Sequence, residues 1–193
     1  MATNLKLIVI WDSAVGKTSI IKRFILNRFE VFYQTTIGVD FLTKKITRED
    51  EEYQLQIWDT VGTERFGSLS KSFYRQADGA IVVFDITNPV SFKNVPSWID
   101  DLKKVLNGKD IPIIICGNKI DIEEREIESE IATQWCSKNK YKYIETSAAL
   151  DIGVKQMIND FVDVMIQTKE DTNTEFKIIP VKIENEATNE SCC

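Results

Sequence analysis

The sequence predicts an α/β domain built on an open, mostly parallel six-stranded β-sheet, with one antiparallel edge strand and helices on both faces. Three observations support this prediction. Short β-branched runs alternate with longer segments whose apolar residues recur at helical spacing. Residues 80–86 and 111–117 are almost continuously apolar, which is typical of parallel strands covered on both sides. Residues 53–57 instead alternate apolar and polar, which is typical of a half-buried strand in a hairpin.

The strands and helices can be placed along the chain from these patterns. Strands are expected at residues 5–10, 41–47, 53–58, 80–86, 111–117 and 141–145. The second and third strands are separated by the polar residues 48–52, so they form the antiparallel pair. Helices are expected at residues 17–29, 91–106, 129–139 and 153–167. Because proline lacks the N–H that a helix interior needs, Pro96 is expected to mark the true opening turn of the second helix.

The helix at residues 153–167 has the clearest pattern in the chain. Its apolar residues share one face at helical spacing and are Val154, Met157, Ile158, Phe161, Val162 and Met165. From residue 168 onward the chain is rich in Thr, Asn and Glu and has no periodic apolar stripe. We therefore expect one folded domain over residues 1–167 and a flexible tail over residues 168–193.

The composition excludes several classes of function. The 193 residues include 24 Lys and Arg against 30 Asp and Glu, and this net charge of -6 argues against nucleic-acid binding, which needs basic groups. Histidine is absent, which excludes Ser-His-Asp and Cys-His triads, HExxH zinc sites and Cys/His zinc fingers. The four cysteines form no CxxC pair, so no disulfide framework is expected and a reducing compartment fits better.

The first chemical motif, W-D-S-A-V-G-K-T at residues 11–18, lies between the first strand and the first helix. Its last three residues match the phosphate-loop pattern GxxxxGK followed by Ser or Thr, although Trp11 replaces the first glycine. In such a loop, backbone N–H groups surround phosphate oxygens, Lys17 reaches the outer phosphates and the Thr18 hydroxyl binds Mg²⁺. The candidate phosphate-binding residues are Ser13, Ala14, Val15, Gly16, Lys17, Thr18 and Ser19. An ordinary strand–turn–helix is the alternative for this motif taken alone.

Two weaker motifs also follow predicted strands. In W-D-T-V-G at residues 58–62, Asp59 can hold a metal ion through a water molecule, and Gly62 can offer its N–H to a terminal phosphate. In E-T-S-A at residues 145–148, the backbone can cap a bound base. Each pattern is common in ordinary turns and indicates little by itself.

The motif N-K-I-D at residues 118–121 directly follows the fifth strand and is more specific. The Asp121 carboxylate would accept both N–H groups on the edge of guanine in a charge-assisted pair. Adenine has no 2-amino group there, so the buried carboxylate would be left unpaired and guanine would be preferred. Asn118 and Lys119 complete this base-binding loop. All four motifs therefore fall at the carboxyl edge of one sheet, where ligands bind in open α/β folds.

With these motifs in this order, residues 5–167 resemble the small GTPases of the Ras superfamily, and in particular the Rab family. The Rab-like segments are I-G-V-D-F at 37–41, E-R-F at 64–66, F-Y-R at 73–75 and D-I-T-N at 85–88. The resemblance implies a Ras-like P-loop fold, bound Mg²⁺ and GTP or GDP, and hydrolysis of GTP. It also implies a monomeric switch in vesicle trafficking that acts with exchange factors, activating proteins, a GDP-dissociation inhibitor and effectors.

The resemblance also assigns roles to individual residues. Those assigned to the nucleotide, besides the phosphate loop and N-K-I-D, are Phe29, Tyr33, Thr36, Gly62, Ser147, Ala148 and Ala149. Those assigned to the metal ion are Thr18, Thr36 and Asp59, and those assigned to catalysis are Lys17, Thr36, Gly62 and Thr63. Partners would bind at residues 31–41 and 62–76, whose order would change on hydrolysis. The apolar part of that surface would be Ile37, Phe41, Trp58 and Phe73, although core packing is an equal alternative for Phe41 and Trp58.

Three residues depart from the family pattern. Thr63 stands where the family has the glutamine that orients the attacking water, and it is too short for that role, so intrinsic hydrolysis should be slow. Activating proteins of the Rab family can supply a glutamine in trans. Trp11 brings a bulky side chain to a turn that approaches phosphate, so its indole must point away, for example into the core behind the loop; otherwise the phosphate cradle is distorted and affinity falls. Ala149 replaces a lysine whose stem would cover part of the base.

The pair Cys192 and Cys193 resembles the double geranylgeranylation signal of the Rab family, and two unmodified thiols are the alternative. Two lipid chains give stable anchoring. The residues from 168 onward hold six acidic and three basic side chains, so no polybasic patch adds attraction to anionic lipid. The expected location is the cytoplasmic face of an intracellular membrane, with cycling through the cytosol.

Two other functions compete with the switch. A binding scaffold that holds nucleotide permanently, or none, is suggested by Trp11 and Thr63. A P-loop phosphotransferase acting on a small metabolite would instead prefer adenine, and the N-K-I-D motif argues against it.

Overall fold

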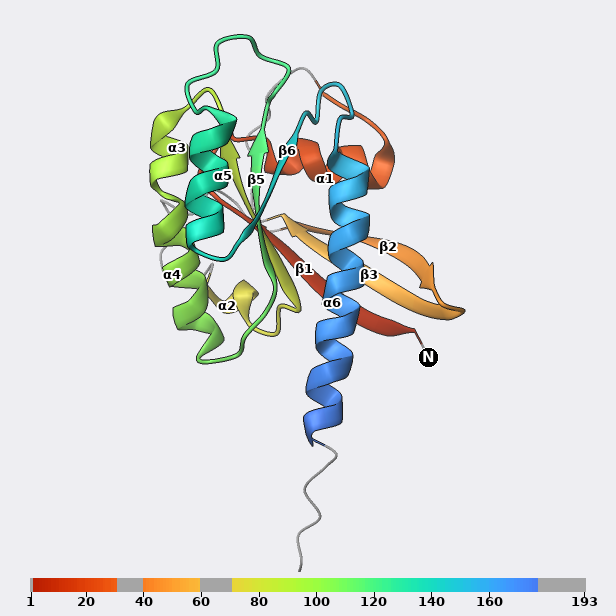
Figure 1. Ribbon diagram of the computed structural model, residues 1–193. Coiled ribbons are helices and arrows are strands. Elements are labelled where there is room, and N and C mark those ends of the chain that lie inside the picture. The colour runs from red at the N-terminus through yellow and green to blue at the C-terminus, as the bar shows by residue number, and fades with distance from the viewer. Residues whose placement is uncertain (1, 31–39, 60–70, 177–193) are drawn as a thin grey trace, which may run out of the picture.

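The computed structural model describes residues 2–30, 40–59 and 71–176, whose strands form one six-stranded sheet in the order β2-β3-β1-β4-β5-β6 (Figure 1). The strands are β1 Thr3–Ile10, β2 Asp40–Arg48, β3 Glu51–Asp59, β4 Gly79–Asp85, β5 Ile113–Asn118 and β6 Lys142–Thr146. Among these strands, only the edge strand β2 runs antiparallel to its neighbour, and the other neighbours pair in parallel. The predicted sheet is therefore confirmed.

Helices pack on both faces of this sheet. They are α1 Lys17–Leu26, α2 Lys71–Tyr74, α3 Pro89–Lys93, α4 Val95–Leu106, α5 Ser129–Lys138 and α6 Val154–Phe176. Figure 1 shows α1 and α6 on one side of the sheet, and α3, α4 and α5 on the other. In the described ranges, no helix is both long and apolar enough to cross a membrane.

The predicted helices have different boundaries in the structure. The helix predicted at residues 91–106 is divided into α3 and α4, and Pro96 lies in the first turn of α4, as predicted. The helix predicted at residues 17–29 ends at Leu26, because Asn27 takes a left-handed conformation with φ 55°. The short helix α2 was not predicted.

The centre of the sheet forms the core. All of β4 is buried, as is most of β1 and β5. The helix α6 lies so close to the start of β4 that a Cβ added at Gly79 would be 2.7 Å from Met165 Cγ. Residue 79 must therefore stay small, since protein interiors are close-packed. The core holds the strand ends rigidly in place, and these ends carry the loops of the candidate site.

The helix α6 continues to Phe176, so the predicted end at residue 167 is wrong. Lys169 explains part of this extension. Its Nζ donates to the Asn4 carbonyl (2.8 Å) and to Asp78 Oδ2 (3.0 Å), so α6 is held against β1 and the start of β4. Residues 168–176 of the expected tail are thus helical, and residues 177–193 lie outside the described part of the chain.

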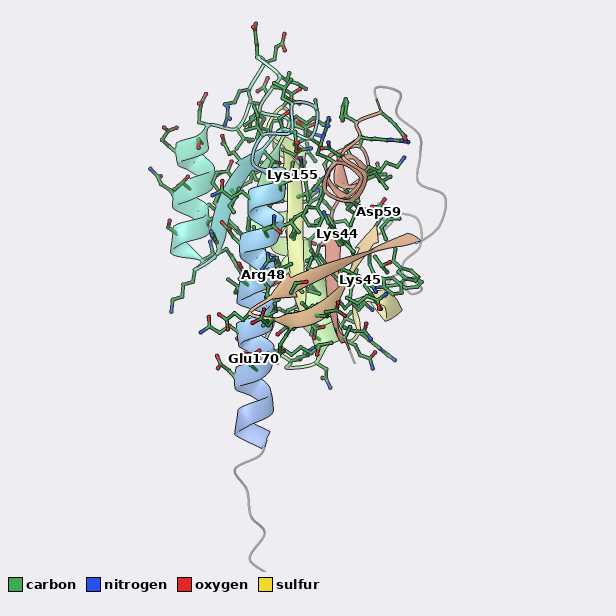
Figure 2. The ribbon with its side chains drawn as sticks, turned by 90° about the vertical axis from the view of Figure 1, so that its right-hand side faces the viewer. Lys44, Lys45, Arg48, Asp59, Lys155 and Glu170 are labelled. Carbon is green, nitrogen blue, oxygen red and sulfur yellow. The ribbon has the colours of Figure 1, made fainter. Side chains whose placement is uncertain are left out.

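The hairpin of β2 and β3 is tied to the helices on its side of the sheet. Arg48 Nε donates to Asp163 Oδ1 of α6 (2.6 Å), and Figure 2 shows Arg48 beside that helix. Lys44 Nζ donates to the Phe24 carbonyl of α1 at 3.2 Å. The antiparallel edge is therefore anchored to both helices that cover this face.

Candidate functional site

The phosphate-loop motif follows β1 directly, and the side chain of its first residue packs into the core behind the loop. Trp11 has a φ of 159°, close to extended backbone, and its side chain is only 1% exposed. The indole packs against Trp98 of α4, with ring centroids 6.0 Å apart. The prediction that this indole points away from the loop into the core is confirmed, so the side chain does not fill the space in front of the loop.

The next residue, Asp12, is fixed by the same helix. Trp98 Nε1 donates to Asp12 Oδ1 (3.1 Å), and Asn94 Nδ2 donates to Asp12 Oδ2 (3.0 Å). Charge-assisted hydrogen bonds of this kind fix a carboxylate firmly. The sequence analysis did not identify Asp12, because Asp12 occupies a position that the phosphate-loop pattern leaves unspecified. Its hydrogen-bond partners also lie far along the chain.

Lys17 lies inside the turn of this loop. Its Nζ donates to the carbonyls of Trp11 (3.1 Å) and Asp12 (2.5 Å), and the residue is 6% exposed. The turn requires Gly16, because φ is +99° there and an added Cβ would lie 2.3 Å from Asn118 Nδ2. The loop of Ser13, Ala14 and Val15 leads into this glycine, and Ser19 follows Thr18 in the first turn of α1.

Thr18 and Asp59 meet at the ends of α1 and β3. The Thr18 hydroxyl donates to Asp59 Oδ2 at 2.5 Å, and Asp59 is 7% exposed. Hydroxyl and carboxylate oxygens are the ligands that Mg²⁺ prefers, usually completed by water. The donor set therefore fits the metal ion that the sequence analysis expected, although Thr36 lies outside the described residues.

Asn118, at the end of β5, joins three loops of the site. Its Nδ2 donates to the Val15 carbonyl of the phosphate loop at 3.0 Å. Its Oδ1 accepts from Thr146 Oγ1 (3.1 Å), at the end of β6, and from the Ala148 N–H (3.3 Å), just after that strand. Asn118 is 2% exposed, so these bonds are shielded from water and hold the loops in a fixed relation. Thr146 was also missed, since nothing in E-T-S-A singles it out.

The remaining N-K-I-D side chains are also positioned by partners. Ser147 Oγ donates to Asp121 Oδ1 at 2.6 Å, which orients a carboxylate that is otherwise on an exposed loop. Lys119 has a left-handed φ of 73°, and its Nζ pairs with Asp85 Oδ2 of β4 at 2.6 Å. The structure therefore brings Asn118, Lys119 and Asp121 together with Ser147, and their contact with a base stays a prediction.

The segment after β6 is also tied to α1. Arg23 Nε donates to the Ala148 carbonyl (2.8 Å), and Arg23 Nη2 donates to the Ala149 carbonyl (2.9 Å). The Phe29 ring, 38% exposed, has its centroid 5.9 Å from Arg23 Cζ. The Arg23 guanidinium thus contacts Phe29, Ala148 and Ala149. The sequence analysis did not identify Arg23.

A partly buried ion pair involves Glu145, at the end of β6 where this segment begins. Arg125 forms two parallel bonds to Glu145, Nη1 to Oε1 at 2.8 Å and Nη2 to Oε2 at 2.9 Å. Tyr143 donates its hydroxyl to Glu145 Oε1 at 2.8 Å. Burial alone would raise the pKa of Glu145, but the hydrogen bonds from Arg125 and Tyr143 outweigh it, so the pKa is lowered. Nearby Cys116 is fully buried, and burial raises the pKa of its thiol to about 12.

Part of the expected site lies outside the described residues. The site residues concerned are Tyr33, Thr36, Gly62, Thr63, Cys192 and Cys193. Most of the expected partner segments 31–41 and 62–76, and with them Ile37, lie there too.

Three aromatic residues of the expected partner surface are described. The Phe41 ring stacks on the Trp58 ring, with centroids 4.8 Å apart. The Phe73 ring is tilted relative to the Trp58 ring, with centroids 5.9 Å apart. Phe41 is 47% exposed, and Lys6 Nζ lies 4.3 Å from the Trp58 ring. Phe41 is therefore a surface residue, while Trp58 is partly covered by its neighbours.

The fold and the site define the class of protein. A mostly parallel α/β sheet carries a phosphate-loop motif after β1 and the N-K-I-D loop after β5, and Asn118 joins the two. The family model described as "Ras family" matches residues 6–167. The chain belongs to this family and, among its small GTPases, to the Rab family.

Several relatives are similar over most of the chain. It is 41% identical over 180 residues to Ras-related protein Rab7 of Drosophila melanogaster, covering 82% of this chain and 87% of that protein. It is 36% identical over 192 residues to Ras-related protein Rab-7b of Mus musculus, covering 98% and 96%. Ras-related protein Rab-32D of Dictyostelium discoideum is 40% identical over 178 residues, covering 89% and 78%.

Proposed function

We propose that this Rab7-like small GTPase is a GTP/GDP switch in vesicle trafficking, with slow intrinsic hydrolysis. The observation that carries the proposal is the Asn118 side chain. It donates to Val15 in the phosphate loop and accepts from Ala148 in the segment that we expect to cap the base. The phosphate side and the base side of a nucleotide site would thus be held together. The similarity to Rab7 and Rab-7b supports the trafficking role.

The site residues divide the work of binding. Lys17, held by two carbonyls inside the phosphate loop, would exchange these partners for the outer phosphates. Thr18 and Asp59 would hold Mg²⁺, and the bound ion would supply positive charge to the phosphate oxygens. Asp121, oriented by Ser147, would accept the two N–H groups of guanine.

Catalysis would depend mainly on positioning and charge, as in phosphoryl transfer generally. Thr36 and Gly62 would contact the γ-phosphate, and Tyr33 would cover the phosphates. Thr63 has no amide with which to orient water, so we expect hydrolysis to depend on an activating protein.

The nucleotide carried by the purified protein tests this proposal. We expect bound GDP, slow single-turnover hydrolysis of GTP, and strong stimulation by a Rab-type activating domain. Thr63→Gln should raise the intrinsic rate, because the added amide can orient the water. Protein that folds but binds neither GDP nor GTP would overturn the proposal and favour the binding scaffold, as would bound GTP that no activating domain turns over.

Membrane attachment and partner binding complete the proposal. Cys192 and Cys193 would carry two prenyl groups, as is typical of Rab proteins, and would anchor the chain to the cytoplasmic face of an intracellular membrane. Residues 31–41 and 62–76 would bind effectors and regulators, with Phe41 and Trp58 at the surface that they contact. Intact-protein mass spectrometry of material from eukaryotic cells tests the lipid modification, and replacing both cysteines with serine should abolish it.

A further inference from the structure

Arg23 connects helix α1 to the segment that follows β6. Its Nε and Nη2 donate to two consecutive carbonyls, those of Ala148 (2.8 Å) and Ala149 (2.9 Å). A guanidinium presents its N–H groups in a rigid planar fork, so it can satisfy two adjacent acceptors at once. The charge of the donor makes both bonds stronger than bonds between neutral groups.

The same segment is pinned from its other side. The Ala148 N–H donates to Asn118 Oδ1 at 3.3 Å, while its carbonyl accepts from Arg23. Ala148 is therefore held between β5 and α1, and it is only 3% exposed. Removing Arg23 would keep the bond from Ala148 to Asn118 but remove these two bonds to the helix that begins at the phosphate loop.

Arg23 also lies beneath Phe29, the residue proposed to stack on the base. The guanidinium carbon is 5.9 Å from the ring centroid, a distance at which a cation attracts an aromatic face. Ala149 has only a methyl group to place against a base, so the cover that this segment gives must come from the position of its backbone. One side chain thus touches both residues 148–149 and the aromatic ring.

We propose that Arg23 is a positioning residue that sets how long a guanine nucleotide stays bound. It fastens residues 148–149 to α1 and supports Phe29, and so keeps the base side of the site closed. This inference rests on the proposed nucleotide binding. Because Arg23 makes its contacts at the base side, its loss should speed nucleotide release without slowing hydrolysis of the bound nucleotide.

The test compares three variants of the full chain loaded with a fluorescent GDP analogue in excess Mg²⁺. Arg23→Gln should release nucleotide about tenfold faster, the size expected when hydrogen bonds to a charged donor are lost. Arg23→Lys keeps the charge but loses the fork, so it should also release faster. Lys22→Gln is the matched control, because it removes one charge from the same helix and breaks a surface pair with Glu30.

A second measurement separates positioning from general damage. Single-turnover hydrolysis of preloaded GTP should be unchanged in Arg23→Gln and Arg23→Lys. A loss of hydrolysis in parallel with faster release would overturn the proposal, and so would equal release rates in Arg23→Gln and Lys22→Gln. Full retention of nucleotide by Arg23→Lys would show that charge alone matters, which also contradicts it. Wild-type protein that binds no guanine nucleotide would instead overturn the proposed function itself.

Discussion

Trp11 occupies a position where the phosphate-loop pattern has glycine, and the structure explains why tryptophan fits. The backbone there is close to extended, with φ 159°, so the conformation does not demand glycine. The space behind the loop is filled by the indole and by Trp98, while Asn94 and Trp98 hold Asp12. The loop is therefore braced against α4 instead of being distorted.

This bracing predicts that Trp11→Gly destabilises the fold. Removing a buried indole leaves a cavity, and the cost for tryptophan truncation in a core is about 3–5 kcal/mol. The measurement is urea unfolding at saturating GDP and Mg²⁺. Trp11→Phe is the control and should cost less, because it keeps an aromatic ring, and the buried Trp11 Nε1 has no hydrogen-bond partner in the described residues. Unchanged stability of Trp11→Gly would contradict the role given to the indole.

Asp121 gives a second prediction at this scale. Asp121→Asn should weaken GDP binding and shift preference toward xanthosine diphosphate, whose base presents a carbonyl where guanine has an amino group. Competition between the two diphosphates measures the shift. Ser147 can still donate to an amide oxygen, so the loop should keep its shape. An unaltered base preference would show that Asp121 does not contact the base.

At the scale of elements, β6 is joined to the loop after β5 by Arg125 and Glu145. Both side chains are 23% exposed, and the carboxylate accepts from Arg125 and Tyr143. Since the pKa of Glu145 is lowered in the folded protein, its ionised form stabilises the fold at neutral pH. That contribution is present above the unfolded pKa, near 4.3, and is lost as pH falls through the folded pKa.

Glu145→Gln should therefore lower the free energy of unfolding at pH 7 by about 1–2 kcal/mol, discounted for partial exposure. The difference from wild type should shrink as the pH falls below the unfolded pKa, because the carboxylate of the unfolded chain is protonated first, and the contribution is lost as the pH falls through the lowered pKa of the folded protein. Urea unfolding over a pH series measures this convergence. A difference that stays constant down to pH 3 would mean that the carboxylate charge is not responsible.

The long helix α6 depends on contacts at the end of the sheet opposite the candidate site. Asp78 accepts from the Lys6 backbone N–H (2.9 Å) and from Lys169 Nζ (3.0 Å). Asp78→Ala should cost about 1–3 kcal/mol, because it leaves a partly buried N–H without this acceptor. Lys169→Ala removes a partly exposed charge and its bonds to Asn4 and Asp78, and it should cost less than about 1 kcal/mol. Equal losses in thermal unfolding would contradict this ranking.

At the scale of the whole molecule, a buried sheet carries the loops that we expect to respond to the nucleotide. β4 is fully buried; its neighbour β1 leads into the loop before Lys17, and its neighbour β5 ends at Asn118. Hydrogen exchange should therefore differ between GTP-bound and GDP-bound protein in residues 31–41 and 62–76. The amides of β4 and β5 should exchange equally slowly in both states, since they open only with the core. Large differences in β4 would contradict a switch confined to these loops.

The sequence alone determined the alternation of strands and helices, because burial on both faces and helical spacing are local patterns. It also placed four motifs at strand ends, and parallel strands bring such ends to one edge. It did not determine the bracing of Trp11 and Asp12 by α4, the bonds from Arg23 to residues 148–149, or the continuation of α6 to Phe176. Each of these depends on side chains that meet only after the chain has folded. The partners lie far apart in the sequence, so neither segment has a periodic pattern that predicts the contact.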